Sequence, residues 1–235
     1  MLDPIRVFIG WDRTEVVAWH VLAHSIQERA SEPVAISPVM LNQLTPYFRR
    51  GEHALASTEF SFSRFLVPFL AGYEGWALFM DCDMLCRRDI AELWAQRDER
   101  YAVQVVKHDH EPQNTVKFND RIQTRYAKKN WSSVMLLNCA RCRALTADYV
   151  NSASGLELHQ FKWLDNDEEI GALPPVWNHL VGYDAYTEDA ALVHYTEGGP
   201  YFNTYRDCDY AGEWFATRDR MLTAVDLSSQ AQAAG

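Results

Sequence analysis

Hydrophobic residues gather into short runs that predict the strands of a buried sheet. Residues 76–80 are five consecutive apolar residues, and residues 5–10 form a β-branched run that ends at a glycine. Runs without polar alternation are typical of strands that helices cover on both faces. Residues 34–39 form another run, which Pro38 is expected to break. Three further strands are predicted at residues 101–106, 131–138 and 190–196.

Helical periodicity separates these runs. Residues 16–30 predict a helix with Thr14 as its cap and with Val16 at the start of its apolar stripe. Four more helices are predicted, at residues 61–72 with a bend at Pro68, at 89–94, at 146–150 and at 209–225. A strand, a helix and a strand in this order begin a βαβ unit. We therefore expect an α/β fold with a mostly parallel central sheet flanked by helices.

Length and composition indicate one domain. The chain has 235 residues, of which 48% are hydrophobic, enough for one sizeable core. We expect a single domain over residues 1–227 and a disordered polar tail over residues 228–235. The net charge of -10, with no basic block to offset it, argues against nucleic acid as a partner. No apolar run approaches a membrane span, so we expect a cytoplasmic protein without integral membrane contact.

Two carboxylates directly follow the apolar run at 76–80. Asp81 and Asp83 lie two positions apart, so in an extended chain their side chains point to the same side while Cys82 points away. Ligands of parallel sheets bind beyond the carboxyl ends of the strands, where this pair lies. Two oxygen ligands suit Mn²⁺ or Mg²⁺, which keep open positions for the phosphates of a nucleotide. The same spacing is also common in solvated turns.

Other groups offer rival metal sites. Residues 107–110, Lys-His-Asp-His, have the density of ligands, although an exposed polar loop is the simpler explanation. Cys139 and Cys142 have the spacing of half a zinc site, and His20 and His24 lie one helical turn apart. The five cysteines are an odd number and form no disulfide framework, so reduced thiols and packed histidines are the simpler interpretation.

Further polar positions mark candidate binding residues. Arg64 lies in the helix that leads into the Asp81 strand, and the loop around Gly10 and Asp12 leaves the first strand at its carboxyl end. Residues 111–130 are polar and aperiodic, as expected of an insertion that contacts substrate. Residues 165–167 form a third acidic cluster.

Two more groups suggest ligand contacts. Ser132, Ser133 and Asn138 are polar residues on a predicted buried strand, and a bound sugar is one partner that they can have. Gly198 and Gly199 let the backbone pass close to a ligand, where their amides can face a phosphate.

Taken together, these segments resemble the retaining glycosyltransferases that include glycogenin and the bacterial lipopolysaccharide galactosyl- and glucosyltransferases, a family 8-like group. The resemblance rests on segments 7–12, 62–66, 79–84, 131–138, 165–167 and 194–200, in this order. It implies a GT-A fold and a hexosyltransferase that uses a nucleotide-diphospho-sugar donor, UDP-hexose above all. It also implies a saccharide or other hydroxyl acceptor, and Mn²⁺ or Mg²⁺ held by Asp81, Asp83 and His194.

The resemblance also implies roles for the other residues. Arg64 lies near the donor sugar, and the catalytic cluster Asp165, Asn166 and Asp167 lies near its hydroxyls. The residues expected to contact the donor are Phe8, Ile9, Gly10, Asp12, Arg64, Ser132, Ser133, Asn138, Gly198 and Gly199, with the first four near the nucleoside.

The sequence departs from the family pattern at two positions. The lysine that often follows the metal-binding histidine is absent from residues 197–200, and Trp131 stands where many members have asparagine. Two other classes of protein remain open, a metal-dependent nucleotidyltransferase and a non-catalytic nucleotide-sugar-binding protein.

Overall fold

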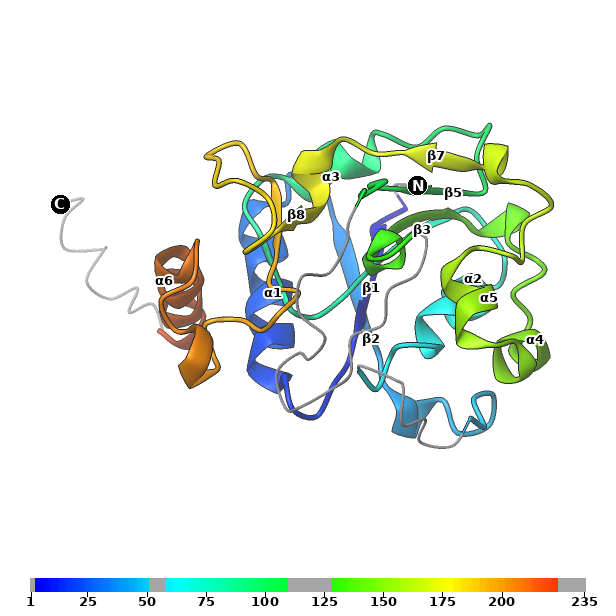
Figure 1. Cartoon of the computed structure of the whole chain (residues 1–235), viewed down its shortest axis with the longest axis horizontal. Helices are drawn as coiled ribbons and strands as arrows, with labels where there is room; N and C mark the ends of the chain where they lie inside the picture. Colours follow the sequence, from blue (N-terminus) through cyan, green and yellow to red (C-terminus); the bar gives the residue numbers. More distant parts are fainter. Residues whose placement is uncertain (1–2, 51–57, 110–127, 224–235) are drawn as a thin grey trace, which may run out of the picture.

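The computed structural model describes residues 3–50, 58–109 and 128–223, which form a mixed α/β fold around a six-stranded sheet (Figure 1). Its strand order is β2-β1-β3-β6-β5-β7. These strands are β1 (Ile5–Gly10), β2 (Val34–Val39), β3 (Trp76–Met80), β5 (Val103–Val105), β6 (Val134–Asn138) and β7 (Ile170–Ala172). β1 is parallel to β2 and β3, and β5 to β7, whereas β6 is antiparallel to β3 and β5. The predicted mostly parallel central sheet is confirmed.

Strands β3 and β6 form the centre of this sheet and are buried along their whole length. Trp76 lies opposite Asn138, and Met80 lies opposite Val134. The carboxyl end of β3 therefore meets the amino end of β6. Because β6 runs antiparallel to β3, the residues at the start of β6, and not those at its end, lie near Asp81.

A second, three-stranded sheet has the order β4-β9-β8. It consists of β4 (Met84–Cys86), β8 (His179–Leu180) and β9 (Leu192–His194). Leu85 of β4 and Val193 of β9 belong with Tyr195 to a separate apolar cluster, whereas Met84, Cys86 and Leu192 pack in the main core. Because only Asp81, Cys82 and Asp83 separate β3 from β4, the two sheets meet at the carboxylates.

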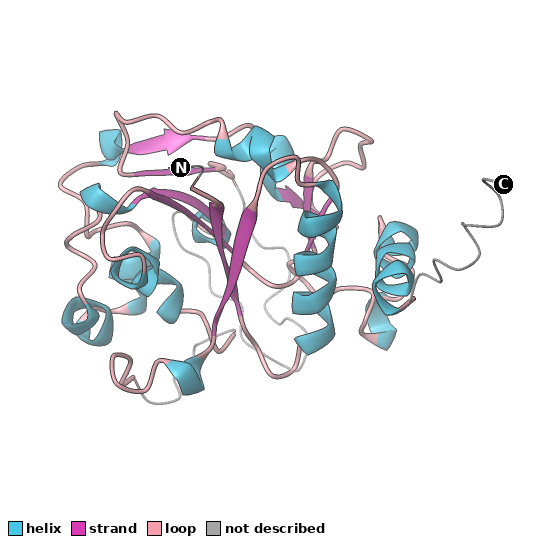
Figure 2. Ribbon diagram, turned by 180° about the vertical axis from the view of Figure 1, so that it is seen from behind, coloured by secondary structure: helices cyan, strands magenta, loops and turns pink. Residues whose placement is uncertain are grey.

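α1, the longest helix of the described residues, contacts both β4 of the second sheet and the C-terminal helix α6, and both ribbon views show α1 between the main sheet and α6 (Figure 2). The helices are α1 (Val16–Arg29), α2 (Val67–Leu70), α3 (Ile90–Trp94), α4 (Ala147–Ser152), α5 (Gly155–His159) and α6 (Ala211–Leu222). Thr146 caps α4 as predicted, because its side chain accepts a hydrogen bond from the backbone N–H of Tyr149.

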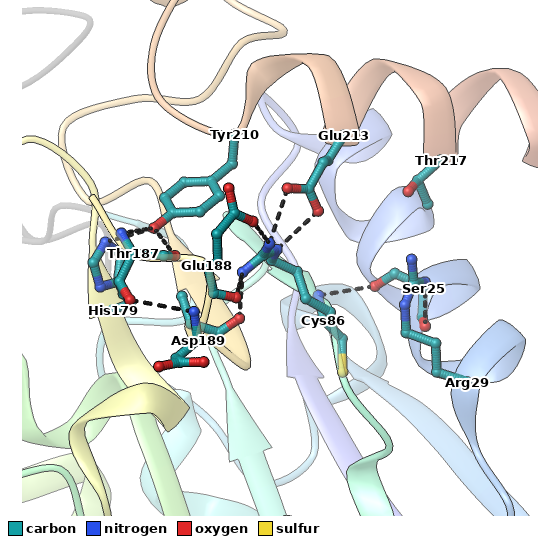
Figure 3. Close-up of polar contacts among 12 residues, drawn as sticks. Ser25, Arg29, Cys86, His179, Thr187, Glu188, Asp189, Tyr210, Glu213 and Thr217 are labelled. Atoms are coloured by element: carbon teal, nitrogen blue, oxygen red, sulfur yellow. Dashed lines mark hydrogen bonds and ion pairs between the residues drawn. The ribbon is translucent and has the colours of Figure 1, made fainter.

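Hydrogen bonds fasten α6 to the second sheet (Figure 3). The hydroxyl of Tyr210 donates to the carbonyl of Thr187 at 2.8 Å and accepts from its N–H at 3.0 Å. Glu213 accepts from the Arg87 guanidinium at 2.8 and 3.0 Å, and Arg87 also donates to the carbonyl of Ala190. On α1, the hydroxyl of Ser25 accepts from the N–H of Cys86 at 3.1 Å (Figure 3). α1, α6 and β4 are thus joined by polar as well as apolar contacts.

The structure corrects the details of the first predicted helix. Thr14 does not cap α1: the N-cap is Glu15, and the Thr14 hydroxyl donates to Asp12 instead. Val16 is 37% exposed, whereas Ala18 and Val21 are buried, so the buried face is rotated from the predicted stripe. The rotation follows from packing against β4 and α6 as well as against the main sheet.

Three other boundaries differ from prediction. Pro38 does not break β2, because this edge strand pairs on one side only and loses no partner at a proline. Pro68 lies in the first turn of α2, which follows a 3₁₀ turn at Ser63–Leu66, instead of bending one longer helix. Residues Trp131–Ser133 form a 3₁₀ turn ahead of β6, and Asn130, in the left-handed conformation, precedes this turn.

All five cysteines are free and four are buried, in agreement with the expected reduced thiols. Within the described residues no helix combines the length and apolarity that a membrane crossing requires. The predicted tail at 228–235 and most of the polar segment 111–130 lie outside the described residues. The single domain over residues 1–227 stays a prediction.

The contact between α1 and α6 generates a prediction for stability against pH. Arg220 donates to both carboxylate oxygens of Glu28, at 2.6 and 2.9 Å, and chiefly this hydrogen bonding lowers the pKa of Glu28 to about 2. Because the pKa of Glu28 is lower in the folded state than the unfolded value of 4.5, its ionised carboxylate stabilises the fold above pH 4.5. This stabilisation is lost as the pH falls toward 2. Arg220→Met should lower the unfolding free energy at pH 7 by about 0.5–1 kcal/mol, because the pair is partly exposed.

Urea denaturation at pH 7 and pH 3 measures the effect. The difference between Arg220→Met and the parent should shrink at the lower pH. Arg218→Met is the control, since Arg218 lies on the same helix and forms its ion pair with neighbouring Asp219. A loss of equal size at both pH values contradicts the assignment.

Candidate metal centre

Three potential ligands converge where the two sheets meet. Asp81 follows β3, Asp83 precedes β4, and His194 ends β9 directly opposite Met84. One ligand atom from each lies within 4.8 Å of the others. Across the described ranges this is the one group of three or more such residues with metal-binding proximity. The predicted set of Asp81, Asp83 and His194 is therefore brought together in space.

The surroundings of these residues are electronegative. The buried thiol of Cys82 has a pKa well above its usual value, first because it is withdrawn from water and then because Glu15, Asp83, Asp81 and Asp12 are negative. Neighbouring negative charges disfavour a further anion and favour a cation. Two carboxylates and an imidazole in such a field fit Mn²⁺ or Mg²⁺.

Arg64 supplies positive charge from the opposite flank. Its Nη1 lies 2.8 Å from Oδ1 of Asp81 and donates to the carbonyl of Ser132 at 3.0 Å. The guanidinium also lies over the rings of Phe60 and Phe79, at 5.1 and 5.2 Å from their centroids. Arg64 is buried, and its planar guanidinium contacts the carboxylate, the carbonyl and the two ring faces at the same time.

His194 is held by a residue that the sequence did not single out. Its Nδ1 lies 3.0 Å from Oδ1 of Asn178, while its Nε2 lies 3.4 Å from Oδ1 of Asp83. Asn178 is completely buried at the end of the 3₁₀ turn Pro175–Asn178. In sequence it belongs to a proline-rich connection, and no spacing relates it to His194.

The residues of the first strand mainly build the fold. Ile9 is buried in the core, Phe8 is half-buried, and a Cβ on Gly10 would overlap the ring of Phe60. Asp12 accepts hydrogen bonds from the N–H and hydroxyl of Thr14 and from the N–H of Glu59. Its carboxylate thus ties the loop after β1 to residues 58–61.

Of the three polar residues predicted on β6, the structure brings two to the site. The carbonyl of Ser133 accepts from the N–H of Asp81 at 2.9 Å, and the carbonyl of Ser132 accepts from Arg64. Asn138 lies at the other end of the sheet, opposite Trp76, and its amide donates to Glu99. Asn138 is removed from the site because β6 runs antiparallel to β3.

The acidic cluster at 165–167 lies on the surface and is not part of the three-residue metal group. Oδ1 of Asp167 lies 2.6 Å from Nζ of Lys128, and this hydrogen bond is the main reason that the pKa of Asp167 is lowered. Asn166 accepts from the N–H of Glu168 and caps the 3₁₀ turn Asp167–Glu169. Asp165 donates its backbone N–H to Glu169.

Gly198 and Gly199 are surrounded by aromatic rings. Gly198 has a φ of 140°, and a Cβ there would lie 2.6 Å from the ring of Tyr205. A Cβ on Gly199 would overlap the ring of Tyr201, whose hydroxyl donates to Glu15. Close packing of the loop after His194 thus accounts for both glycines without a ligand.

The rival metal sites do not assemble in the part of the chain that the structure describes. His24 faces Glu28 at 3.3 Å, and His20 packs edge-on against Trp19. The thiol of Cys142 lies 3.2 Å from the carbonyl of Asn138. In the 107–110 cluster, His110 lies outside the described residues.

Solved structures that this chain resembles include glycosyltransferases. GlyE of Streptococcus pneumoniae TIGR4 matches with a TM-score of 0.62 at 12% identity, over 94% of this chain and 61% of GlyE. The galactosyltransferase LgtC, crystallised with donor and acceptor sugar analogues, matches with 0.56 at 14% identity, over 94% of this chain and 98% of LgtC. The bifunctional WbbM gives 0.55 at 15%, over 93% of this chain and 50% of WbbM. The chain thus has the GT-A glycosyltransferase fold and spans about half to three fifths of WbbM and GlyE.

Sequence comparison adds a relative that is much more similar. The chain is 46% identical over 222 residues to Protein CDI of Arabidopsis thaliana, an alignment that covers 90% of this chain and 85% of that protein. The chain therefore belongs to the family of Protein CDI. No family model matches it.

The Arg64 contacts predict that lysine cannot replace this arginine. In Arg64→Lys the ammonium keeps the charge but cannot serve Asp81 and the Ser132 carbonyl with the same planar geometry. We expect the unfolding free energy of the metal-free protein to fall by about 1–3 kcal/mol, as measured by urea denaturation. Arg97→Lys, an exposed arginine bonded to one carbonyl, is the control and should change it by less than about 0.5 kcal/mol. Equal losses in both variants would disprove a special role for Arg64.

Proposed function

We propose that this protein is a metal-dependent glycosyltransferase that moves a sugar from a nucleotide-diphospho-sugar to an acceptor hydroxyl. The observation that carries the proposal is the convergence of Asp81, Asp83 and His194 within 4.8 Å at the carboxyl end of β3, in a chain with the GT-A fold. In α/β sheets this is the edge where ligands bind.

The roles of the site residues follow from the chemistry of the leaving group. Departure of a nucleoside diphosphate concentrates negative charge on a phosphate oxygen. Asp81, Asp83 and His194 would hold a divalent ion, and that ion would supply Lewis-acid stabilisation of the charge. Arg64 orients Asp81 through their ion pair and keeps the local carboxylates partly neutralised.

Positive charge beside Arg64 supports diphosphate binding without a lysine after His194. The pKa of His159 is well below its usual value, first because the ring is withdrawn from water and then because Arg64 and Lys129 are positive. Nδ1 of His159 lies 2.8 Å from the hydroxyl of Ser132. One flank of Asp81 is therefore electropositive and the Cys82 flank electronegative, the polarity that a bound cation and a diphosphate require.

The resemblance to family 8-like enzymes makes the proposal more specific. We infer a hexosyltransferase with a UDP-hexose donor, a saccharide or other hydroxyl acceptor, and retention of anomeric configuration. LgtC, which has the same fold, was crystallised with donor and acceptor sugar analogues. Asp165, Asn166 and Asp167 then orient the hydroxyls of the donor sugar, with Arg64 on the side of the diphosphate.

Removing one ligand tests the metal centre. Asp83→Asn keeps the shape of the side chain but removes its charge. We expect the affinity for Mn²⁺ together with a UDP-hexose to fall by more than the roughly 10- to 100-fold that loss of an outer hydrogen-bond partner costs. Isothermal titration calorimetry measures this, and circular dichroism checks that the fold is intact.

Asp148→Asn, an exposed carboxylate on α4, is the matched control and should bind like the parent. Unchanged binding in Asp83→Asn would refute the assigned site. Saturable binding of the nucleotide sugar by the parent, with neither transfer nor hydrolysis, would indicate a binding protein. Release of pyrophosphate from a nucleoside triphosphate would indicate a nucleotidyltransferase.

The stereochemistry of the product is a separate prediction. An inverting enzyme needs a protein base opposite the leaving group, whereas in a retaining enzyme the departing phosphate oxygen can accept the acceptor proton. The Lys128 hydrogen bond makes Asp167 a weak base at neutral pH. We expect an α-linked product from an α-linked donor, detected from the anomeric proton by nuclear magnetic resonance of the first-formed product. A β-linkage would contradict retention and the roles of residues 165–167.

A further inference from the structure

Asn178 lies between the two sheets and makes three side-chain hydrogen bonds. Its Nδ2 is 2.9 Å from the hydroxyl of Ser133 and 3.3 Å from the carbonyl of Asn130, and its Oδ1 is 3.0 Å from Nδ1 of His194. The side chain is fully buried, so no water competes for these groups. Of the three partners, only the imidazole of His194 can carry its hydrogen on either of two ring nitrogens. The amide can therefore determine which nitrogen carries it.

The neighbours determine which way the amide faces. The carbonyl of Asn130 can only accept, so the amide atom next to it must be the nitrogen. The hydroxyl of Ser133 donates to the same carbonyl at 2.6 Å, which leaves its oxygen to accept from Nδ2 of Asn178. Both contacts give the same orientation, with Oδ1 toward His194. Oδ1 accepts only, so the hydrogen between Asn178 and His194 belongs to Nδ1 of the ring.

This arrangement selects one tautomer of His194. With its hydrogen on Nδ1, a neutral imidazole carries its lone pair on Nε2. Nε2 is the atom that lies 3.4 Å from Oδ1 of Asp83. Two electron-rich atoms then face each other, which a cation between them stabilises.

The same hydrogen bonds connect the ligands of the two sheets. The carbonyl of Ser133 holds the N–H of Asp81 at 2.9 Å, its hydroxyl holds Asn178, and Asn178 holds His194. The first ligand belongs to the main sheet and the last to β9 of the second sheet. The position of His194 relative to Asp81 is thus set by polar contacts as well as by the path of the backbone.

We propose that Asn178 is a positioning residue that fixes His194 in the Nδ1–H tautomer and so makes Nε2 a metal ligand. This inference rests on the proposed function for the role of the metal, but the tautomer itself is a property of the metal-free protein. Without the Oδ1 acceptor, His194 can carry its hydrogen on Nε2, which blocks the ligand atom. Loss of such a partner lowers metal affinity by about 10- to 100-fold.

The first experiment needs no variant and no metal. Nuclear magnetic resonance of ¹⁵N-histidine-labelled, metal-free protein reports which ring nitrogen of His194 carries the hydrogen, with His194→Gln identifying the signal. In the neutral ring we expect the hydrogen on Nδ1 alone. A neutral ring with its hydrogen on Nε2 overturns the proposal, whether or not the protein binds metal.

The second experiment compares variants. Asn178→Leu should give a mixture of tautomers and a Mn²⁺ affinity 10- to 100-fold weaker by calorimetry, whereas Asn178→Asp keeps the acceptor and should hold the Nδ1–H tautomer. Asn151→Leu is the matched control, because Asn151 also makes three side-chain hydrogen bonds but lies on α4, on the opposite side of the fold from β8 (Figure 1).

The outcomes separate the two proposals. A parent that binds no Mn²⁺ but has His194 as Nδ1–H refutes the proposed metal centre and supports the positioning by Asn178. A single Nδ1–H tautomer with unchanged Mn²⁺ affinity in Asn178→Leu overturns the role of Asn178. If Asn178→Leu does not fold, the tautomers of the parent and of Asn178→Asp decide the question.

Discussion

The concentration of carboxylates where β3 meets the second sheet is the constraint on which the rest of the structure depends. Burying an ionised carboxylate costs several kcal/mol unless charged or hydrogen-bonding partners accompany it. Arg64 pairs with Asp81, Thr14 and Glu59 donate to Asp12, and Tyr201 donates to Glu15. These partners come from segments as far apart as the first loop and the loop after β9. Satisfying the carboxylates therefore also fixes how distant parts of the chain pack together.

The two-sheet architecture follows from the same place in the chain. After Met80 the chain leaves the main sheet, passes through the two aspartates and enters β4, which pairs with β9 and brings in His194. A site built in this way draws its ligands from two sheets, so relative movement of the sheets would separate them. The side chain of Asn178 limits that movement, because it joins Ser133, next to β6 of the main sheet, to His194 of the second sheet.

The sequence was informative where local chemistry decides the structure. The apolar run at 76–80, the glycine-ended first strand and the Thr146 cap each depend on neighbouring residues, and all appear as predicted. The direction of β6 depends on a long-range pairing that no local pattern reports, so the sequence does not show that Asn138 lies at the opposite end of the sheet from Asp81.

The same limit applies to the candidate site. The spacing of Asp81 and Asp83 can be read directly, and His194 came only from the resemblance to a known family. Asn178 has neither a spacing signal nor a counterpart in that resemblance. Because Asn178 is buried, its amide must form hydrogen bonds, but the sequence does not show with which residues. The fold alone determines that one partner is His194.

The contacts of Ser133 and Asn178 bear on how much of the site exists before any ligand binds. Hydrogen bonds already hold the backbone of Asp81 and the ring of His194, and an ion pair holds the side chain of Asp81. These side chains are therefore already oriented in the folded protein. Binding a cation would cost little additional side-chain entropy. A bound cation would instead relieve the mutual repulsion of Asp81 and Asp83, of which Asp81 pairs with Arg64. The two carboxylates and the imidazole at the junction of the sheets would therefore favour a cation there.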